Sequence, residues 1–328
     1  MNTMQEGISV ESIKSQIRKQ ELTPPLDELA EQYEERVGIR DTYVWKWFRY
    51  CFTFGTLDCV PDRRLEYVAT HKSVLSMYIT LIDDLSEVQA DKASFREAKK
   101  IPFDHMTADT SDADVDSEYL EFMQEVWETV ERLFEEAPRE SEFRDLFEFD
   151  FKQTLHGMEY EYLVNDSMEI TNEEELMDYT QHNMMILPAV DVDMMYSPAF
   201  DRRETHVVRK TAYRCQRLAR MSNWLSTWER ELEEGDFSSP LFTEAVEKGV
   251  VSIDEFESFD ESDSTGSATE LVAAVRDAGI EQDLEDRWQT QHSRLRSELP
   301  EADSVDLESY LDAFDTVYDY HMASKGLK

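Results

Sequence analysis

The stretch from Asn223 to Asp236 reads NWLSTWERELEEGD and carries three oxygen-bearing side chains, Asn223, Thr227 and Glu231, at steps of four residues. On an α-helix, a step of four residues turns about 400°, so each side chain lies about 40° round and about 6 Å along from the previous one. Amide, hydroxyl and carboxylate oxygens are the hard ligands that Mg²⁺ or Mn²⁺ prefers. The spacing therefore predicts a helix edge that binds a divalent cation, with Arg230 placed to reach an anion held by that cation.

A second acidic stretch, IDDLSE at residues 82–87, ends the long apolar segment at residues 65–84. Asp83 and Glu87 are four residues apart and share a helix face, whereas Asp84 lies about 100° round the helix. Negative charge is unfavourable at the C-terminus of a helix. A bound cation would relieve this penalty, so the stretch is a second candidate metal-binding edge.

Taken together, the two stretches resemble the motifs of the class I terpene synthase family. The family's aspartate-rich motif is written DDxxD or DDxxE, and its second motif has Asn or Asp, then Ser or Thr, then Glu, at steps of four. The matching residues here are Asp83, Asp84 and Glu87 in the first motif and Asn223, Thr227, Arg230 and Glu231 in the second. The resemblance implies an all-α fold over residues 1–328, a single-domain class I terpenoid synthase-like helical bundle with a central active-site cavity.

The resemblance also implies a cofactor and a reaction. It implies about three Mg²⁺ ions per site, with Mn²⁺ as the alternative ion, because charged oxygens and diphosphate favour hard cations. The implied metal ligands are Asp83, Asp84, Glu87, Asn223, Thr227 and Glu231, of which Asp83 and Glu231 are taken as catalytic. The implied reaction ionises a linear prenyl diphosphate, with farnesyl diphosphate as the expected substrate, and cyclises or quenches the carbocation while diphosphate is released.

Two alternatives to a terpene synthase stay open. A prenyl-chain-elongating or condensing synthase has related chemistry, but such enzymes have a second aspartate pair where this chain has Asn223 and Trp224. A non-catalytic helical binding protein on the same fold is the other alternative. Exchange of Glu231 for Gln separates an enzyme from a binding protein, because only an enzyme needs that carboxylate.

The residues expected to bind the diphosphate depart from the family pattern. Arg230 and Arg220 are the expected cations on the helix of the second motif. The family usually has an arginine three residues after a tyrosine, but the position three after Tyr179 is His182. The usual Arg-Tyr pair near the C-terminus is missing, and Tyr320 is expected to take its place. A basic strip precedes the second motif and is expected to pair with acidic helices: Arg209, Lys210, Arg214 and Arg217.

Composition limits the classes of partner. The 328 residues include 73 acidic and 33 basic ones, which gives a formal charge of −40. This charge argues against nucleic acid and against an anionic membrane surface as partners, and it indicates adaptation to a high-salt cytoplasm, as in a halophile. Three cysteines without metal spacing predict free thiols in a reducing compartment. No signal peptide or apolar run of about 18 residues is visible, so we expect a cytoplasmic protein without a membrane span, as a monomer or homodimer.

The few glycines and prolines divide the chain into helical segments. An N-terminal helical segment is expected at 1–40, broken at Thr23-Pro24-Pro25, and a mobile acidic loop at 252–268. Residues 88–115 are expected to form a loop, and Pro188 to break a helix near 184–187. Helix caps are expected at Asp116 or Ser117 and at Thr171. The expected apolar cavity wall consists of Ser76, Ile79, Thr80, residues 184–187 and either Trp224 or Trp228.

Overall fold

The computed structural model of the protein describes residues 10–257 and 264–323, and these residues form helices and connections without any β-strand. The all-α fold class predicted from the sequence is confirmed. The principal helices are α1 (Val10–Arg18), α2 (Leu26–Arg36), α3 (Tyr43–Phe54), α4 (Leu65–Asp83), α6 (Ser117–Glu135), α7 (Glu140–Asp166), α9 (Ile186–Met195), α10 (Thr205–Glu234), α14 (Ile280–Ser297) and α15 (Leu307–Ala323). The remaining α-helices are α5 (Lys92–Ala98), α8 (Glu173–Thr180), α11 (Pro240–Glu247), α12 (Ile253–Glu257) and α13 (Ser264–Asp277).

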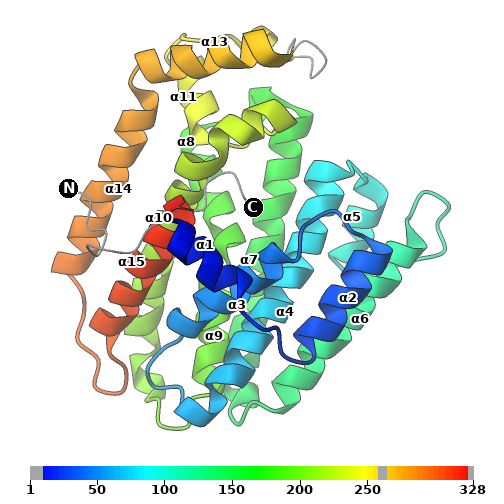
Figure 1. The fold of residues 1–328 in the computed structure, drawn as a ribbon, viewed down its shortest axis with the longest axis vertical. Helices are drawn as coiled ribbons and strands as arrows, with labels where there is room; N and C mark the ends of the chain where they lie inside the picture. Colours follow the sequence, from blue (N-terminus) through cyan, green and yellow to red (C-terminus); the bar gives the residue numbers. More distant parts are fainter. Residues whose placement is uncertain (1–9, 258–263, 324–328) are drawn as a thin grey trace.

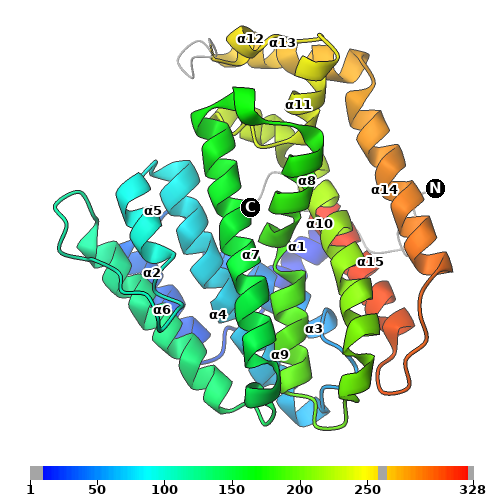
Figure 2. The ribbon, with the colours of Figure 1, turned by 180° about the vertical axis from the view of Figure 1, so that it is seen from behind.

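Four helices, α4, α7, α9 and α10, run side by side along the long axis of the molecule (Figure 1). Helices α2 and α6 pack beyond α4 on one side, and α14 and α15 pack against α10 on the other. Seen from behind, α7, α9 and α10 lie in front of α3, while α11 to α13 cross one end of the molecule (Figure 2). This arrangement surrounds the middle of the bundle with α3, α4, α7, α10 and α15.

Helix α4 is apolar on nearly all sides, and its residues from Val68 to Ile82 are buried. A helix that is hydrophobic all round belongs in the interior, where every face meets another element. The C-terminal end of this helix matters to the site, because its last residue, Asp83, lines a cavity. Within the described residues, no helix combines the length and the apolar character that crossing a bilayer requires.

The helix break predicted near Pro188 is present. A 3₁₀ turn (Gln181–Met184) follows α8, and Met185 adopts a left-handed conformation with φ of 55° before α9 begins. Because proline cannot donate a backbone hydrogen bond, a continuous helix through this point is unfavourable. The break turns the side chains of residues 183–185 toward the interior of the bundle.

Several local predictions need correction. The segment 88–115 contains the helix α5, whose N-cap Asp91 accepts a hydrogen bond from the Ser94 amide at 3.0 Å. The segment predicted as a loop at 252–268 is helical at both ends, in α12 and α13, and residues 258–263 lie outside the described part. The cap of α8 is Asn172, whose Oδ1 accepts from the Glu175 amide at 2.9 Å, and not Thr171.

Other local predictions are confirmed. Asp116 caps α6 by accepting a hydrogen bond from the Tyr119 amide at 3.0 Å. The helical structure is interrupted at residues 23–25, between α1 and α2. These features depend on neighbours in sequence, which explains why local patterns were sufficient to predict them.

Candidate active site

A cavity of about 350 Å³ lies between α3, α4, α7, α10 and α15. Both candidate metal-binding edges contribute to its wall, through Asp83 on α4 and through Asn223, Thr227 and Glu231 on α10. The structure therefore brings together residues that are far apart in sequence. Much of the remaining wall is apolar, with aromatic side chains from α3 and α15.

The edge on α10 has the geometry that the four-residue spacing predicts. The Thr227 hydroxyl lies 2.6 Å from Glu231 Oε1, and Arg220 donates to Asn223 Oδ1 at 2.7 Å. Glu231 is 8% exposed, and burial followed by repulsion from Asp236 raises the pKa of its carboxyl to about 8. The side-chain oxygens of Asn223, Thr227 and Glu231 therefore lie at a part of the cavity wall where the negative charge is not fully neutralised.

The two aspartates of the aspartate-rich edge have different surroundings. Asp83 lines the cavity, whereas the fully buried Asp84 turns away and accepts hydrogen bonds from Arg40 Nε at 2.6 Å and from the Tyr33 hydroxyl at 3.3 Å. Burial and the nearby Asp83 charge raise the pKa of Asp84 to about 6, against the lowering effect of Arg40. Glu87 lies in a π-helical turn (Asp84–Val88), and its side chain is outside the described part of the structure.

Arg40 is a cavity residue that the sequence did not indicate. It precedes α3 and also bonds Asp83 Oδ2 at 3.2 Å, so one guanidinium bridges the aspartate pair. No local motif marks this arginine, because its role depends on α3 packing against α4. The guanidinium thus places a positive charge beside both carboxylates of the aspartate edge.

Glu161 is a second residue that the sequence did not indicate. It lies on α7 and is 5% exposed, and it accepts hydrogen bonds from Arg220 and from the Asn183 amide. Burial raises its pKa to about 8; Arg220 opposes this shift, while Asp236, Asp83 and Glu231 add to it. Glu161 lines the same cavity as Asp83 of one candidate metal-binding edge and Glu231 of the other. The available signal in the sequence was spacing, because Glu161 continues the apolar stripe of Phe147, Phe151, Leu155 and Met158 at steps of three or four residues.

The residues of the two edges fit Mg²⁺ in chemistry. Within the described residues, no three His, Cys, Asp or Glu side chains cluster closely enough to form a complete metal site on their own. Each edge instead offers a few hard oxygens in a cavity where carboxylates outnumber arginines. Mg²⁺ commonly takes one or two carboxylates and completes its octahedron with phosphate oxygens or water. A divalent cation would also remove the repulsion that raises the pKa values of Glu161 and Glu231.

Two predicted cations on α10 line the cavity. Arg220 is 7% exposed, lies 4.7 Å from the centre of the Trp224 ring and connects Glu161 to Asn223. Arg230 is half-exposed and pairs with Glu234. In the basic strip, Arg209, Arg214 and Arg217 pair with acidic residues of other elements, as expected.

Three predicted substrate residues lie elsewhere in the described structure. Tyr179 is 47% exposed and packs against Tyr160. His182 bonds Gln216 at 3.2 Å, and burial lowers its pKa. The left-handed conformation of Met185 explains the position of His182, because it places residues 183–185 at the cavity and leaves His182 to face α10.

The third of these residues, Tyr320, lies on the C-terminal helix and outside the cavity lining. Tyr320 packs against Tyr50 and Phe54 in a separate cluster, while Phe314, Val317, Tyr318 and His321 of the same helix line the cavity. Tyr320 lies about 100° round the helix from His321 and outside the stripe formed by Phe314, Val317, Tyr318 and His321. The packing of α15 decides which of its faces borders the cavity, and the sequence alone did not show this.

The predicted apolar wall is confirmed in part. Ser76, Ile79 and Thr80 line the cavity, as do Met184 and Met185. Leu187, Trp224 and Trp228 are instead core residues. Trp47, Phe48 and Phe52 of α3 line the cavity without having been predicted there.

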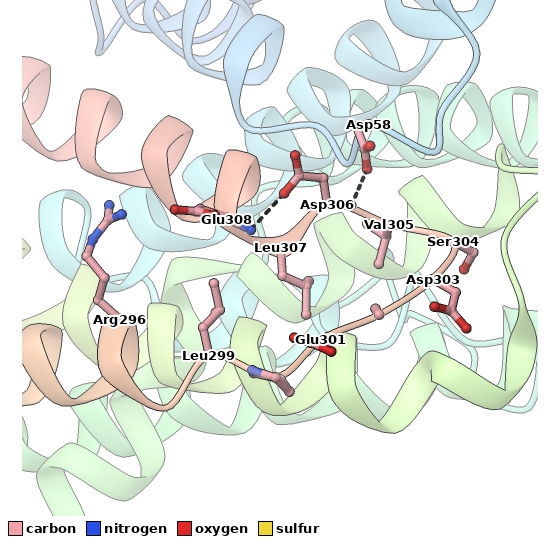
Figure 3. A pocket seen from close by; sticks show the side chains of 12 residues that line it. Asp58, Arg296, Leu299, Glu301, Asp303, Ser304, Val305, Asp306, Leu307 and Glu308 are labelled. Carbon is pink, nitrogen blue, oxygen red and sulfur yellow. Dashed lines mark hydrogen bonds between the residues drawn. The ribbon is translucent and has the colours of Figure 1, made fainter.

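A second hollow, of about 610 Å³, lies beside the loop between α14 and α15 (Figure 3). Its wall is strongly acidic and shares no described residue with the central cavity, and its arginine, Arg296, pairs with Asp312 and Asp315. An anionic substrate would be repelled there. The central cavity is therefore the better candidate for an active site.

Comparison with known proteins identifies the fold. No protein-family description and no curated protein matches this sequence. A geranylgeranyl pyrophosphate synthase structure matches with a TM-score of 0.64 at 12% identity, covering 96% of this chain and 99% of the other. The heptaprenyl diphosphate synthase from Staphylococcus aureus matches with a TM-score of 0.58 at 10% identity, covering 94% and 96%. The geranylgeranyl pyrophosphate synthetase from the archaeon Geoglobus acetivorans matches with a TM-score of 0.56 at 12% identity, covering 95% and 99%. The chain thus has the all-α fold of the isoprenyl diphosphate synthases.

Proposed function

We propose that the protein is a Mg²⁺-dependent enzyme that ionises a linear prenyl diphosphate in the central cavity. The observation that carries this proposal is the meeting of Asp83 with the Asn223, Thr227 and Glu231 edge around one cavity with a largely apolar wall. Hard oxygens suit the metal and the diphosphate, while the apolar wall suits a hydrocarbon chain. The fold, shared with synthases of prenyl diphosphates, supports the same substrate class.

Asp83, Asn223, Thr227 and Glu231 would hold the metal, and Asp84 would fix the aspartate edge through Arg40. Bound Mg²⁺ would neutralise the charge that develops on the departing diphosphate. Arg220 is already held in orientation by Glu161 and Asn223, so it can meet a diphosphate oxygen with little reorganisation. Arg230 adds a cation at the more exposed part of the wall.

The fate of the carbocation defines two candidate reactions. Chain elongation is favoured by the three similar structures named above, which are by name two geranylgeranyl and one heptaprenyl diphosphate synthase. Cyclisation or quenching, as in a terpene synthase, is favoured by the residues of the second motif, where Asn223 and Trp224 replace an aspartate pair. Both reactions share the ionisation step and the need for a wall that excludes water.

The test is an incubation of the full chain in molar KCl with Mg²⁺ and each linear prenyl diphosphate in turn, geranyl, farnesyl and geranylgeranyl. Each is supplied with and without isopentenyl diphosphate, and both released diphosphate and extractable products are measured. Turnover only with isopentenyl diphosphate, giving longer prenyl diphosphates, would establish elongation. Release from one allylic diphosphate alone, with a cyclic or hydroxylated hydrocarbon, would establish a terpene synthase. A folded sample without any turnover would contradict both reactions and leave a helical binding protein.

A further inference from the structure

The cavity contains an imidazole that neither metal binding nor ionisation uses. Phe314, Val317, Tyr318 and His321 of α15 line the cavity, at the spacing that places residues on one face of a helix. Within the described lining, His321 is the one histidine. Its ring centre lies 6.3 Å from that of Trp47, so an aromatic wall adjoins it.

Ser226 fixes the orientation of this imidazole. The Ser226 hydroxyl lies 2.9 Å from the Asn223 carbonyl oxygen and 2.7 Å from His321 Nε2. A hydroxyl has one hydrogen and a carbonyl can only accept, so Ser226 donates to Asn223 and accepts from an Nε2–H. In that neutral tautomer, Nδ1 is the basic atom of the ring.

The other polar groups of the cavity are poorly suited to accept a proton from a carbocation. Arginine remains protonated under all ordinary conditions. The carboxylates Asp83 and Glu231 lie at the metal-binding edges, where a bound cation lowers their basicity. His321 instead lies on α15, next to aromatic side chains that border the space for a hydrocarbon.

We propose that His321 is the catalytic base that accepts the proton lost by the carbocation at the end of the reaction. This inference rests on the proposed function and holds for either candidate reaction. The C–O bond breaks with its electron pair leaving on diphosphate. A C=C bond of the same chain, or of isopentenyl diphosphate, then supplies its π-electron pair to the new C–C bond, and the positive charge moves to the other carbon of that C=C bond. A C–H bond next to the cationic carbon then supplies its electron pair to a C=C bond, and its proton passes to His321. The products are an alkene, diphosphate and an imidazolium that returns its proton to solvent.

The test measures the deprotonated product formed per diphosphate released, in water labelled with ¹⁸O. In the His321→Gln variant, the amide still donates to Ser226 but lacks a basic nitrogen. We expect this ratio to fall by about tenfold or more, with ¹⁸O-labelled alcohol making up the difference. Ser226→Ala should lower the ratio by a smaller factor, because the ring remains but loses its orientation.

The matched control is His206→Gln, which removes an exposed imidazole at the beginning of α10 that bonds the backbone carbonyl of Arg203. It should keep the wild-type ratio. His321→Phe tests the same chemistry with an aromatic ring against Trp47 should His321→Gln fail to fold. A wild-type ratio in either folded His321 variant would overturn the assignment while leaving the proposed function intact. Failure of the wild-type protein to release diphosphate from any substrate would instead overturn the proposed function itself, and the assignment with it.

Discussion

Two groups of buried charges in this molecule differ in how completely they are neutralised. One is the ion pair between Lys72 on α4 and Asp193 on α9, at 2.5 Å, with both side chains fully buried. The ammonium also donates to the Gly55 carbonyl at 3.0 Å, and the carboxylate accepts from the Leu57 amide at 3.1 Å. This closed pair has as many positive as negative groups and ties the α3–α4 connection to α9.

The other group is the cavity cluster, defined here as Asp83, Glu161, Arg220, Glu231 and Asp236. It faces a cavity, and even with Arg40 and Arg230, which line that cavity too, four carboxylates stand against three arginines. The raised pKa values of Glu161 and Glu231, about 8 in each, reflect burial together with this mutual repulsion. The difference teaches that buried charges can have two roles. A balanced pair connects helices, whereas an excess of negative charge next to a cavity favours the binding of an external cation.

The strongest way to break this comparison is to remove charge from the cavity cluster without removing atoms. In Glu231→Gln, we expect diphosphate release to fall by about a thousandfold, because the metal loses a charged ligand and the leaving group loses stabilisation. The melting temperature should stay near that of the wild type or rise, because repulsion with Asp236 is removed.

Glu233→Gln is the matched control, since Glu233 is exposed two residues further along the same helix. It should retain wild-type release. Equal activity in both variants would contradict the metal role of Glu231 and favour a binding protein.

Removing one charge of the Lys72–Asp193 pair should, in contrast, lower the stability of the protein. Lys72→Met leaves Asp193 buried without its cation, and we expect the free energy of unfolding to fall by about 3–5 kcal/mol. Urea unfolding measures this change. The double variant Lys72→Met/Asp193→Leu should recover most of the loss, because two apolar groups replace two charges. A loss of less than about 1 kcal/mol in the single variant would mean that the pair is not electrostatically closed.

His71, next to Lys72 on α4, extends the comparison to a buried group without a charge. Its ring packs 4.4 Å from that of Phe134, neither ring nitrogen has a hydrogen-bond partner among the residues that the structure describes, and burial lowers its pKa to about 3. The unfolded chain therefore takes up the proton first as pH falls, so stability present above pH 6.5 is lost progressively toward pH 3. The loss should be about 1.4 kcal/mol per pH unit at most.

His71→Leu removes this titration. Between pH 6.5 and pH 4.5, the variant should lose about 2 kcal/mol less stability than the wild type, as measured by urea unfolding at each pH. Parallel losses in the two proteins would show that His71 is able to become protonated in the folded state.

Gly157 on α7 tests how closely the cavity cluster depends on the helix break. A Cβ added there would overlap the Asn183 side chain and lie 2.7 Å from the Tyr179 carbonyl oxygen. Gly157→Ala should therefore move the 3₁₀ turn, weaken the Asn183–Glu161 contact and cost about 1–3 kcal/mol of stability. Gly55→Ala, where the added Cβ would meet the Cys51 carbonyl oxygen at an ordinary 3.4 Å, is the control. Equal thermal unfolding of the two variants would contradict the close approach.

Surface charge should give the smallest effect. With a formal charge of −40, the protein should gain about 1 kcal/mol of stability between dilute and molar KCl, since salt screens repulsion between exposed carboxylates. A melting temperature that does not change with KCl would contradict the expected adaptation to high salt. The buried Lys72–Asp193 pair is screened much less, so the loss in Lys72→Met should be similar at both salt concentrations.

The sequence alone determined the features that depend on neighbours along the chain. Helical periodicity predicted the all-α fold, the four-residue spacing placed Asn223, Thr227 and Glu231 on one edge, and Pro188 marked the break before α9. These predictions succeed because dihedral angles and side-chain direction in a helix are set within one or two turns.

Tertiary structure alone decided which residues join the candidate site. Packing turned Asp84 toward Arg40 and Tyr33, brought Glu161 to the cavity that the two metal-binding edges line, and selected the His321 face of α15 over that of Tyr320. None of these contacts joins residues close in sequence. A helix pattern states which residues share a face, but the neighbour that each face meets depends on how all the helices fill the same volume.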